Sequence, residues 1–211
     1  MKIEVRGLTK KFGSGTAVGN VSFVVNEGEL LGLLGPSGSG KTTVLRLIAG
    51  LEVPTSGDIF IDGKRVNDLT VQERNIGFVF QSFNLIPVLT AAQNVELPLL
   101  LTHLSGSERK KRVATALRIV GLEDRMEHYP RQMSGGQEQR VAIARAIVND
   151  PKIIVADEPT GDLDRKSADD VLNLMDKLNK EQGKTIFMVT HDPAAAERAK
   201  IQRKLDKGAL V

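Results

Sequence analysis

One glycine-rich segment combines residue types and a spacing that could bind phosphate groups. It consists of Gly35, Pro36, Ser37, Gly38, Ser39, Gly40, Lys41 and Thr42, and it matches GxxxxGK[ST] at every fixed position. The glycines let such a loop curl, so that several backbone N–H groups point at phosphate oxygens. Lys41 would add a mobile positive charge, Thr42 would offer its hydroxyl to Mg²⁺, and the adjacent Thr43 belongs to the same candidate site. A loop that only turns a strand into a helix would not need all of these positions.

Two adjacent acidic residues follow an apolar run that is typical of a buried strand. The run Ile153–Ala156 is followed directly by Asp157 and Glu158. Because ligands bind beyond the carboxyl ends of strands in open α/β sheets, we expect both carboxylates beside the phosphate loop. Asp157 would hold Mg²⁺, directly or through water, and Glu158 would polarise an attacking water. The alternative is a solvated strand end before a turn at Pro159.

A second segment could also bind an anion. Ser134, Gly135, Gly136 and Gln137 form a capping-box pattern that predicts the start of a helix. Glycine at the first helical positions costs roughly 1 kcal/mol each relative to alanine, so capping alone does not explain the pair. The pair is explained if backbone N–H groups must approach an anion closely. Since the phosphate loop already supplies one nucleotide site, this second site needs a separate role.

Apolar runs and glycine turns indicate how these segments are positioned. Leu30–Leu34 is expected to be a strand buried on both faces, and Lys41–Ala49 a helix after the phosphate loop. Antiparallel strands are predicted at Ile3–Phe12 and Ala17–Val25. Further strands are predicted at Asp58–Ile61, Ile76–Phe80, Ile153–Ala156 and Thr185–Thr190, and further helices from Ser105 to about Val120, at Gln137–Val148 and Arg165–Glu181, and from Pro193.

Composition limits the classes of function that the chain could have. Of its 211 residues, 41% are hydrophobic, which is enough for the core of one ordinary domain. The net charge of +3 is typical of a solvated surface and does not by itself indicate nucleic-acid binding. The absence of cysteine excludes disulfides and thiolate chemistry. No signal peptide and no membrane span are expected, so work at a membrane would need another chain as anchor.

In this order, the motifs resemble those of the ABC ATPase family, the nucleotide-binding subunits of ATP-binding cassette proteins. The segment Met133–Gln137 is similar to the family signature LSGGQ, with methionine in place of leucine. Phe12 stands where the family has an aromatic ring that stacks on adenine. Gln81 matches the Q-loop glutamine that senses Mg²⁺ and the attacking water, and His191 matches the switch histidine that contacts the γ-phosphate. Gly161–Asp164, which includes Asp162, matches the D-loop that communicates across a dimer.

This resemblance implies an α/β fold with a P-loop NTPase core, a mixed sheet and an N-terminal antiparallel β subdomain. Residues 1–211 would form one ABC ATPase domain, with residues 1–81 and 137–211 in the core and antiparallel part. Residues 82–136 would form a helical subdomain between the Q-loop and the signature. ATP and Mg²⁺ are the implied cofactors, and the signature of one subunit would contact the γ-phosphate held by the other. We therefore expect an ATP-dependent head-to-tail homodimer that hydrolyses ATP.

The resemblance also implies a membrane partner. Gly77–Pro87 and Asn94–Leu99 are similar to the ATPase subunits of the lipoprotein-release and macrolide-efflux group. A transmembrane permease subunit would dock near Phe83–Leu101, although these apolar residues could equally be local core, and the chain would lie on the cytoplasmic face of the membrane. Two alternatives stay open: an ATP-driven transmembrane mechanical signaller of the cell-division type, and a soluble ABC ATPase that acts on nucleic acid. The single cassette without a long coiled-coil insertion disfavours the latter, so no nucleic acid is expected.

Overall fold

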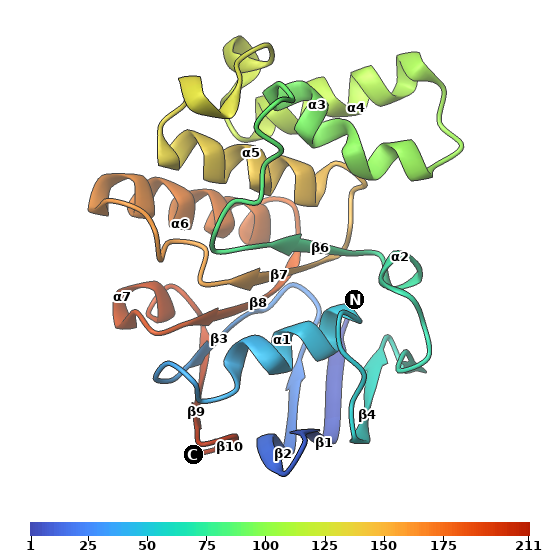
Figure 1. Ribbon diagram of the computed structural model, residues 1–211, viewed down its shortest axis with the longest axis vertical. Helices are drawn as coiled ribbons and strands as arrows, with labels where there is room; N and C mark the ends of the chain where they lie inside the picture. The colour runs from blue at the N-terminus through green and yellow to red at the C-terminus, as the bar shows by residue number, and fades with distance from the viewer.

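The protein contains two β-sheets and a layer of helices, and the structure, a computed structural model, describes residues Met1–Val211 (Figure 1). The larger sheet has the strand order β10-β9-β3-β8-β7-β6, and only the pair β10 and β9 is antiparallel. The mixed sheet expected from the sequence is therefore confirmed. Its strands are β3 (Leu30–Leu34), β6 (Ile76–Val79), β7 (Ile153–Asp157), β8 (Thr185–Thr190), β9 (Ile201–Asp206) and β10 (Ala209–Leu210).

The central strands of this sheet are buried on both faces and supply two separate cores. Successive side chains of a strand point to opposite faces, so Leu31 and Val155 enter one core, whereas Leu30 and Ile154 enter the other. The first core lies against helix α1 (Lys41–Ala49), and the second lies against α5 (Gly135–Ile147) and α6 (Arg165–Lys180). The continuous apolar runs of the sequence follow from this double burial.

The smaller sheet is antiparallel and packs against the opposite side of α1 from the larger sheet (Figure 1). Its strand order is β2-β1-β4-β5, and β1 pairs with both β2 and β4. The residues Val5, Leu8 and Ile59 are buried in the same core as α1. The antiparallel subdomain predicted from the sequence is confirmed. Its strands are β1 (Ile3–Phe12), β2 (Gly15–Val25), β4 (Ser56–Ile61) and β5 (Lys64–Arg65).

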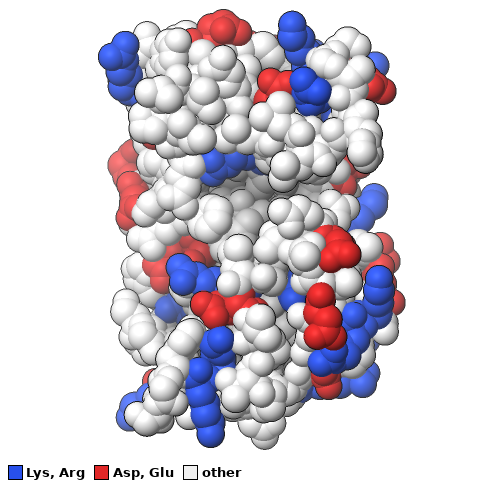
Figure 2. Space-filling model, turned by 45° about the vertical axis from the view of Figure 1, so that its right-hand side comes forward, with Lys and Arg blue, Asp and Glu red and all other residues white.

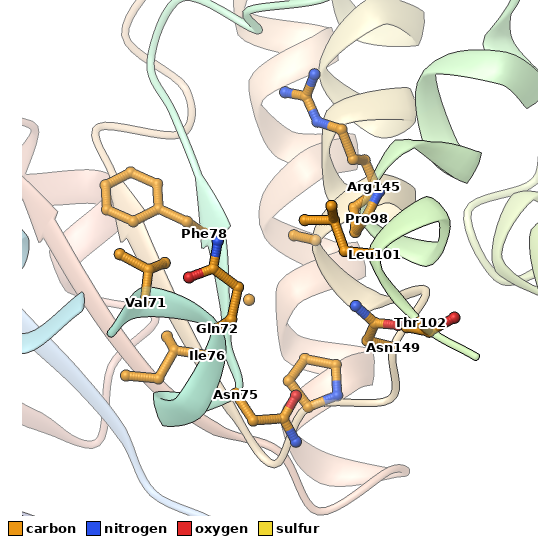
Figure 3. A pocket seen from close by; sticks show the side chains of 13 residues that line it. Val71, Gln72, Asn75, Ile76, Phe78, Pro98, Leu101, Thr102, Arg145 and Asn149 are labelled. Atoms are coloured by element: carbon orange, nitrogen blue, oxygen red, sulfur yellow. The ribbon is translucent and has the colours of Figure 1, made fainter. Parts of the chain in front are cut away.

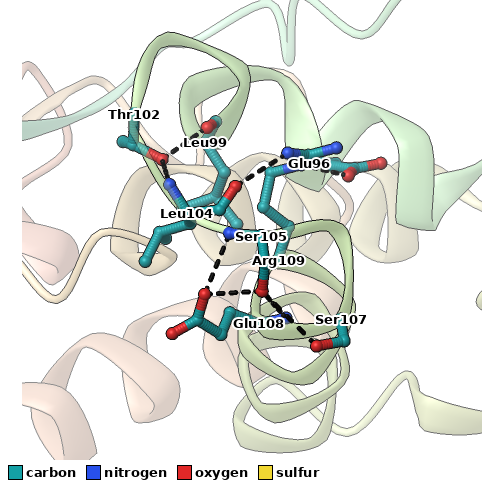
Figure 4. A network of polar contacts seen from close by, with 8 residues as sticks. All are labelled: Glu96, Leu99, Thr102, Leu104, Ser105, Ser107, Glu108 and Arg109. Carbon is teal, nitrogen blue, oxygen red and sulfur yellow. Dashed lines mark hydrogen bonds and ion pairs between the residues drawn. The ribbon is translucent and has the colours of Figure 1, made fainter.

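A helical part follows β6 and lies over α5 at one end of the molecule (Figure 1). It contains α3 (Ala91–Glu96), the 3-10 turn η1 (Leu97–Leu101) and α4 (Gly106–Ile119). The predicted capping boxes at Ser105 and Ser134 are both present. Figure 4 shows Ser105 and Glu108 at the start of α4, and Arg109 Nε donating to Glu96 Oε1 at 2.8 Å, which joins α4 to the end of α3. None of the helices combines the length and the apolar composition needed to cross a membrane.

Several element boundaries differ from the sequence-based expectations. Strand β6 ends at Val79 rather than Phe80, α5 begins at Gly135 rather than Gln137, and α6 ends at Lys180 rather than Glu181. The elements that were not predicted include the short helix α2 (Val71–Arg74) and the strands β5, β9 and β10. Half of the residues of strand β9 are exposed and half are charged, so it lacks the apolar run that revealed the other strands. The short helix from Pro193 is present as α7 (Pro193–Ala196).

Candidate functional site

The phosphate-loop segment joins the end of β3 to the start of α1 and is enclosed by backbone on both sides. A Cβ at Gly35 would lie 2.2 Å from Leu205 O, and a Cβ at Gly40 would lie 2.3 Å from Ala17 O. Glycine at these two positions is therefore required by the close approach of β9 and β2. Gly40 has φ 100°, in the left-handed region, and offers no capping side chain.

The N-terminus of α1 differs from that of every other α-helix in the protein. The helices α2 to α7 each begin after a residue whose side-chain oxygen accepts from a first-turn N–H. Helix α1 has no such cap, so its first N–H groups have no side-chain acceptor. Free N–H groups at a positive helix end are suited to bind an anion such as phosphate.

Lys41 is buried at the base of this loop. Its Nζ donates to Gly35 O at 2.8 Å and to Pro36 O at 3.0 Å, and lies 3.6 Å from Glu158 Oε1. The ammonium group thus lies between the loop and the carboxyl end of β7. A bound phosphate would compete for it with the loop carbonyls and the carboxylate.

Thr42 and Asp157 meet as the sequence predicts for a magnesium site. Thr42 Oγ1 donates to Asp157 Oδ1 at 2.9 Å. Burial raises the pKa of the Asp157 carboxyl above its ordinary value; the hydrogen bond from Thr42 opposes the rise, and the charge of Glu158 adds to it. No group of three or more His, Cys, Asp or Glu residues forms a ready-made metal cage. A hydroxyl with one carboxylate fits Mg²⁺, which keeps waters and takes further oxygens from substrate phosphates.

Glu158 and His191 form the closest polar pair of the site. His191 Nδ1 lies 2.7 Å from Glu158 Oε2. Because a carboxylate only accepts, Nδ1 carries the hydrogen in this bond. The Glu158 side chain is 13% exposed, whereas that of His191 is 53% exposed, so the histidine covers the carboxylate from the solvent side. Glu158 has φ 46°, an uncommon backbone conformation for a residue with a side chain.

The predicted Q-loop and D-loop residues also lie together. Gln81 Nε2 donates to Asp162 Oδ1 at 3.0 Å. A Cβ at Gly161 would lie only 3.1 Å from Gln81 Nε2, so the glycine leaves room for the amide. These residues follow the ends of β6 and β7, which are parallel neighbours.

Most of these residues line one cavity of about 440 Å³, whereas Gly35, Asp157 and Asp162 do not line it. Phe12 does not line it: this residue lies beside the turn between β1 and β2, is 53% exposed, and has Lys10 Nζ 4.8 Å from its ring centroid. Ala17 of β2 does line the cavity and was missed, because a small apolar residue carries no chemical signal. The predicted residues that line it are Ser37, Gly38, Gly40, Lys41, Thr42, Thr43, Gln81, Glu158 and His191.

The segment Ser134–Gln137 lies in a second cavity, of about 210 Å³, that shares no residue with the first. The structure therefore does not bring this segment to the phosphate loop of its own chain. Sequence reasoning missed Arg140 and Lys166, two basic residues that also line this cavity, together with Ser167 and Asp170. Arg140 could have been found from the sequence, because it lies one helical turn after Gly136 and on the same face of the helix.

Comparisons with known proteins identify the family. The model of the family described as ABC transporter matches residues 18–161. An uncharacterised ABC transporter ATP-binding protein of Methanocaldococcus jannaschii, MJ0796, is 48% identical over 204 residues, which cover 90% of this chain and 87% of that protein.

Solved structures give the same result for the fold. The dimeric structure of a post-hydrolysis state of MJ0796 bound to ADP and Pi has a TM-score of 0.87 and 45% identity, and the match covers 99% of this chain and 96% of that one. The structure of cbiO1 from Clostridium perfringens, part of the ABC transporter complex cbiONQ, has a TM-score of 0.90 and 29% identity, with 99% and 86% covered. This chain therefore belongs to the ABC transporter family, as an ATP-binding cassette with ATPase activity.

Proposed function

We propose that two copies of this chain bind ATP between them in a head-to-tail dimer that drives a membrane partner. The observation that carries this proposal is the separation of the cavity at the phosphate loop from the cavity at Ser134–Gln137, which share no residue. The cavity at Ser134–Gln137 combines the N-terminus of α5 with Arg140 and Lys166, against the one acid Asp170, so its charge suits a phosphate. The γ-phosphate held by the phosphate loop of one copy would occupy this cavity of the other. The structure of MJ0796 bound to ADP and Pi is dimeric, which supports a nucleotide-bound dimer of this chain.

Within one copy, the residues around the first cavity would divide the work of binding and hydrolysis. The N–H groups of Ser37–Thr43 and the Lys41 ammonium would hold the phosphates. Mg²⁺, held by Thr42, Asp157 and Gln81, would supply charge neutralisation for the phosphate oxygens. Phe12 would stack on the base from outside the cavity wall.

Glu158 and His191 would act on the reacting atoms. The Glu158 carboxylate would accept a hydrogen bond from the attacking water and orient it toward the γ-phosphate. His191 donates through Nδ1 to this carboxylate, so Nε2 carries no hydrogen in this tautomer and would accept a hydrogen bond, for example from a water beside the γ-phosphate. Lys41 would shift from the carbonyls of Gly35 and Pro36 to the phosphates, and so release its contact with Glu158.

The membrane partner would dock in a groove of about 480 Å³ between the core and the helical part. Figure 2 shows this face hollowed between the two parts, with mainly uncharged side chains around the hollow. Figure 3 shows Val71 of α2 and Phe78 of β6 on one side of the groove and Pro98 and Leu101 of η1 on the other, with the Phe78 ring pointing away from η1. A groove lined by both apolar and polar residues suits a short amphipathic helix.

The exposure of the groove residues refines the docking segment expected from the sequence. Phe83 and Leu85 are only partly exposed, and Leu85 packs against the second core. Leu101, which is 75% exposed, lines the groove, and Val88, which is 77% exposed, lies outside it. We therefore assign the contact with a permease subunit chiefly to η1, α2 and β6. This contact would place the chain on the cytoplasmic face of a membrane.

Glu158→Gln tests the dimer. The amide keeps the shape of the side chain but cannot accept the water proton, so ATP should stay bound between the copies. Sedimentation velocity should show a dimer with ATP and Mg²⁺, and a monomer with ADP. The wild-type hydrolysis rate per chain should rise with protein concentration until the dimer saturates. A variant that binds ATP and yet sediments as a monomer at all concentrations would contradict the proposal.

A further inference from the structure

Gln139 is a fully buried polar side chain in α5, the helix that begins with the signature segment. It is 0% exposed and lies among the buried apolar residues Val141, Ala142 and Ile143 of the same helix. Its Nε2 donates to Pro159 O at 2.6 Å and to Phe80 O at 3.2 Å, and its buried Oε1 has no hydrogen-bond partner. Methionine would fill a similar volume without an unpaired acceptor, so packing alone does not explain an amide here.

The two carbonyl groups that Gln139 binds flank residues of the nucleotide site. Phe80 directly precedes Gln81, and Pro159 directly follows Glu158. Both carbonyls lie just beyond the carboxyl ends of β6 and β7, which are parallel neighbours. One amide group therefore joins α5 to the backbone beside Gln81 and beside Glu158 at the same time.

The backbone of Glu158 needs such a restraint. Its φ of 46° is held in folded proteins only where the surrounding structure fixes it. Its N–H donates to Val189 O at 2.9 Å, and its carbonyl accepts from Gly161 N at 3.0 Å. The bond from Gln139 fixes the next carbonyl along the chain, and it comes from a different element. The direction of the Glu158 side chain thus depends on the position of α5.

Arg145 ties the other end of the Q-loop to the same helix. Its guanidinium donates to Phe83 O at 2.7 Å and to Asn84 O at 2.6 Å. Together with Gln139 at Phe80, it bonds the loop to α5 on both sides of Gln81. A displacement of α5 would therefore carry Gln81 with it.

We propose that Gln139 is a positioning residue that makes the placement of Glu158 and Gln81 depend on α5, and hence on the nucleotide bound at the N-terminus of α5. This inference rests on the proposed function, in which Ser134–Gly136 binds the nucleotide held by a second copy. In the dimer, ATP bound at one site thereby positions the Glu158 carboxylate that orients the attacking water at the other site. The two sites of the dimer are then coupled, and hydrolysis depends cooperatively on ATP.

Gln139→Met tests this role, with Asn179→Leu as the matched control. Asn179 is also a buried amide that donates to two backbone carbonyls, Gly28 O at 2.9 Å and Lys184 O at 2.7 Å, but at the opposite ends of the strands. Gln139→Met should lower kcat about tenfold or more and bring the Hill coefficient for ATP close to one. The Kd for ATP should change less than about twofold, and kcat of Asn179→Leu should stay within about twofold of the wild type.

A double variant separates positioning from general damage. If Gln139 acts through Glu158, then Gln139→Met in a Glu158→Gln background should cause little further loss of hydrolysis and should leave ATP-driven dimerisation intact. The proposal is wrong if Gln139→Met keeps both kcat and cooperativity. It is also wrong if Gln139→Met and Asn179→Leu lose kcat to the same extent for the same loss of folding stability. Should Gln139→Met not fold, Gln139→Asn, whose shorter amide cannot span both carbonyls, gives the same comparison. Failure of Glu158→Gln itself to dimerise would overturn the proposed function instead.

Discussion

Thr42 Oγ1 and Asp157 Oδ1 are joined by a hydrogen bond of 2.9 Å, although 115 positions separate the two residues in the chain. The bond links the first turn of α1 to the last residue of β7. It therefore connects the phosphate loop to the carboxylate strand across the base of the site. The Asp157 carboxylate that accepts this bond is largely desolvated, which affects both the stability of the fold and the binding of a metal.

The first prediction concerns Asp157→Asn. Burial raises the pKa of the Asp157 carboxyl, with the Thr42 hydrogen bond opposing and Glu158 adding to the rise, so the native protein binds this proton more tightly than the unfolded chain does. Stability should therefore fall as pH rises from the ordinary aspartate pKa of about 3.9 through the raised value. Asp157→Asn should raise the Tm of the nucleotide-free protein at neutral pH, and the gain should vanish at low pH.

Thermal unfolding at neutral and at acidic pH shows whether Asp157→Asn changes the Tm in the expected direction. Asp124→Asn, at a side chain that is 67% exposed, is the control and should leave the Tm unchanged at both values. The same Asp157→Asn protein should lose most of the increase in ATP affinity that Mg²⁺ causes in the wild type. A Tm that falls at neutral pH would show that the carboxylate stabilises the native state and would contradict the argument.

The second prediction separates the two glycines of the signature. A Cβ at Gly136 would lie 2.7 Å from Ser167 Oγ and 2.8 Å from Ser167 Cβ, whereas a Cβ at Gly135 would meet nothing closer than 3.5 Å. Gly136→Ala should therefore destabilise the protein by about 1–3 kcal/mol through overpacking against α6. Gly135→Ala should be neutral or stabilise by up to about 1 kcal/mol, because alanine favours the helix.

Urea unfolding of the two variants measures this difference. Equal stability of the two would mean that α6 moves away from α5 at no cost, and the packing explanation would fail. The comparison also limits the sequence-based argument that both glycines are needed for backbone N–H groups to approach an anion. At Gly136, tight packing of α5 on α6 is a sufficient physical reason for glycine.

Local pattern was enough to predict the elements that carry the phosphate loop. The bounds of β3, α1 and β8 agree with those expected, because continuous apolar runs mark strands buried on both faces and the glycine-rich loop marks where α1 begins. The sequence also indicated the loops in which Gln81 and Asp162 lie. Their mutual hydrogen bond could not be predicted, since it depends on the order of β6 and β7 in the sheet.

Features that depend on tertiary contacts were not predictable in the same way. Strand β9, with the exposed run Gln202–Lys204, exists because it pairs with β3 on one side and with β10 on the other. Gln139 was overlooked because a glutamine inside a helix is usually solvated. A signal existed, however: Gly136, Gln139, Ile143 and Ile147 recur at helical spacing on the buried face of α5. A polar residue on an apolar face near a candidate site indicates a buried hydrogen bond.

The third prediction concerns the groove between the core and the helical part. Leu101→Asp would place a charge beside Pro98 in the groove wall formed by η1, where it would weaken the docking of an apolar helix face. Leu101 is 75% exposed in the isolated chain, so its replacement should change the free energy of unfolding by no more than about 0.5 kcal/mol. The purified variant should hydrolyse ATP within about twofold of the wild-type rate.

Retention on membranes provides the measurement. Val53→Asp is the matched control, because Val53 is 69% exposed and lies outside the groove. After expression in cells that contain the membrane partner, Leu101→Asp should be depleted from washed membranes, whereas Val53→Asp and the wild type should stay bound. Equal retention of both variants would exclude the groove as the docking site. Loss of ATPase activity in purified Leu101→Asp would show that this residue supports the fold of the helical part, because no partner is present in that assay.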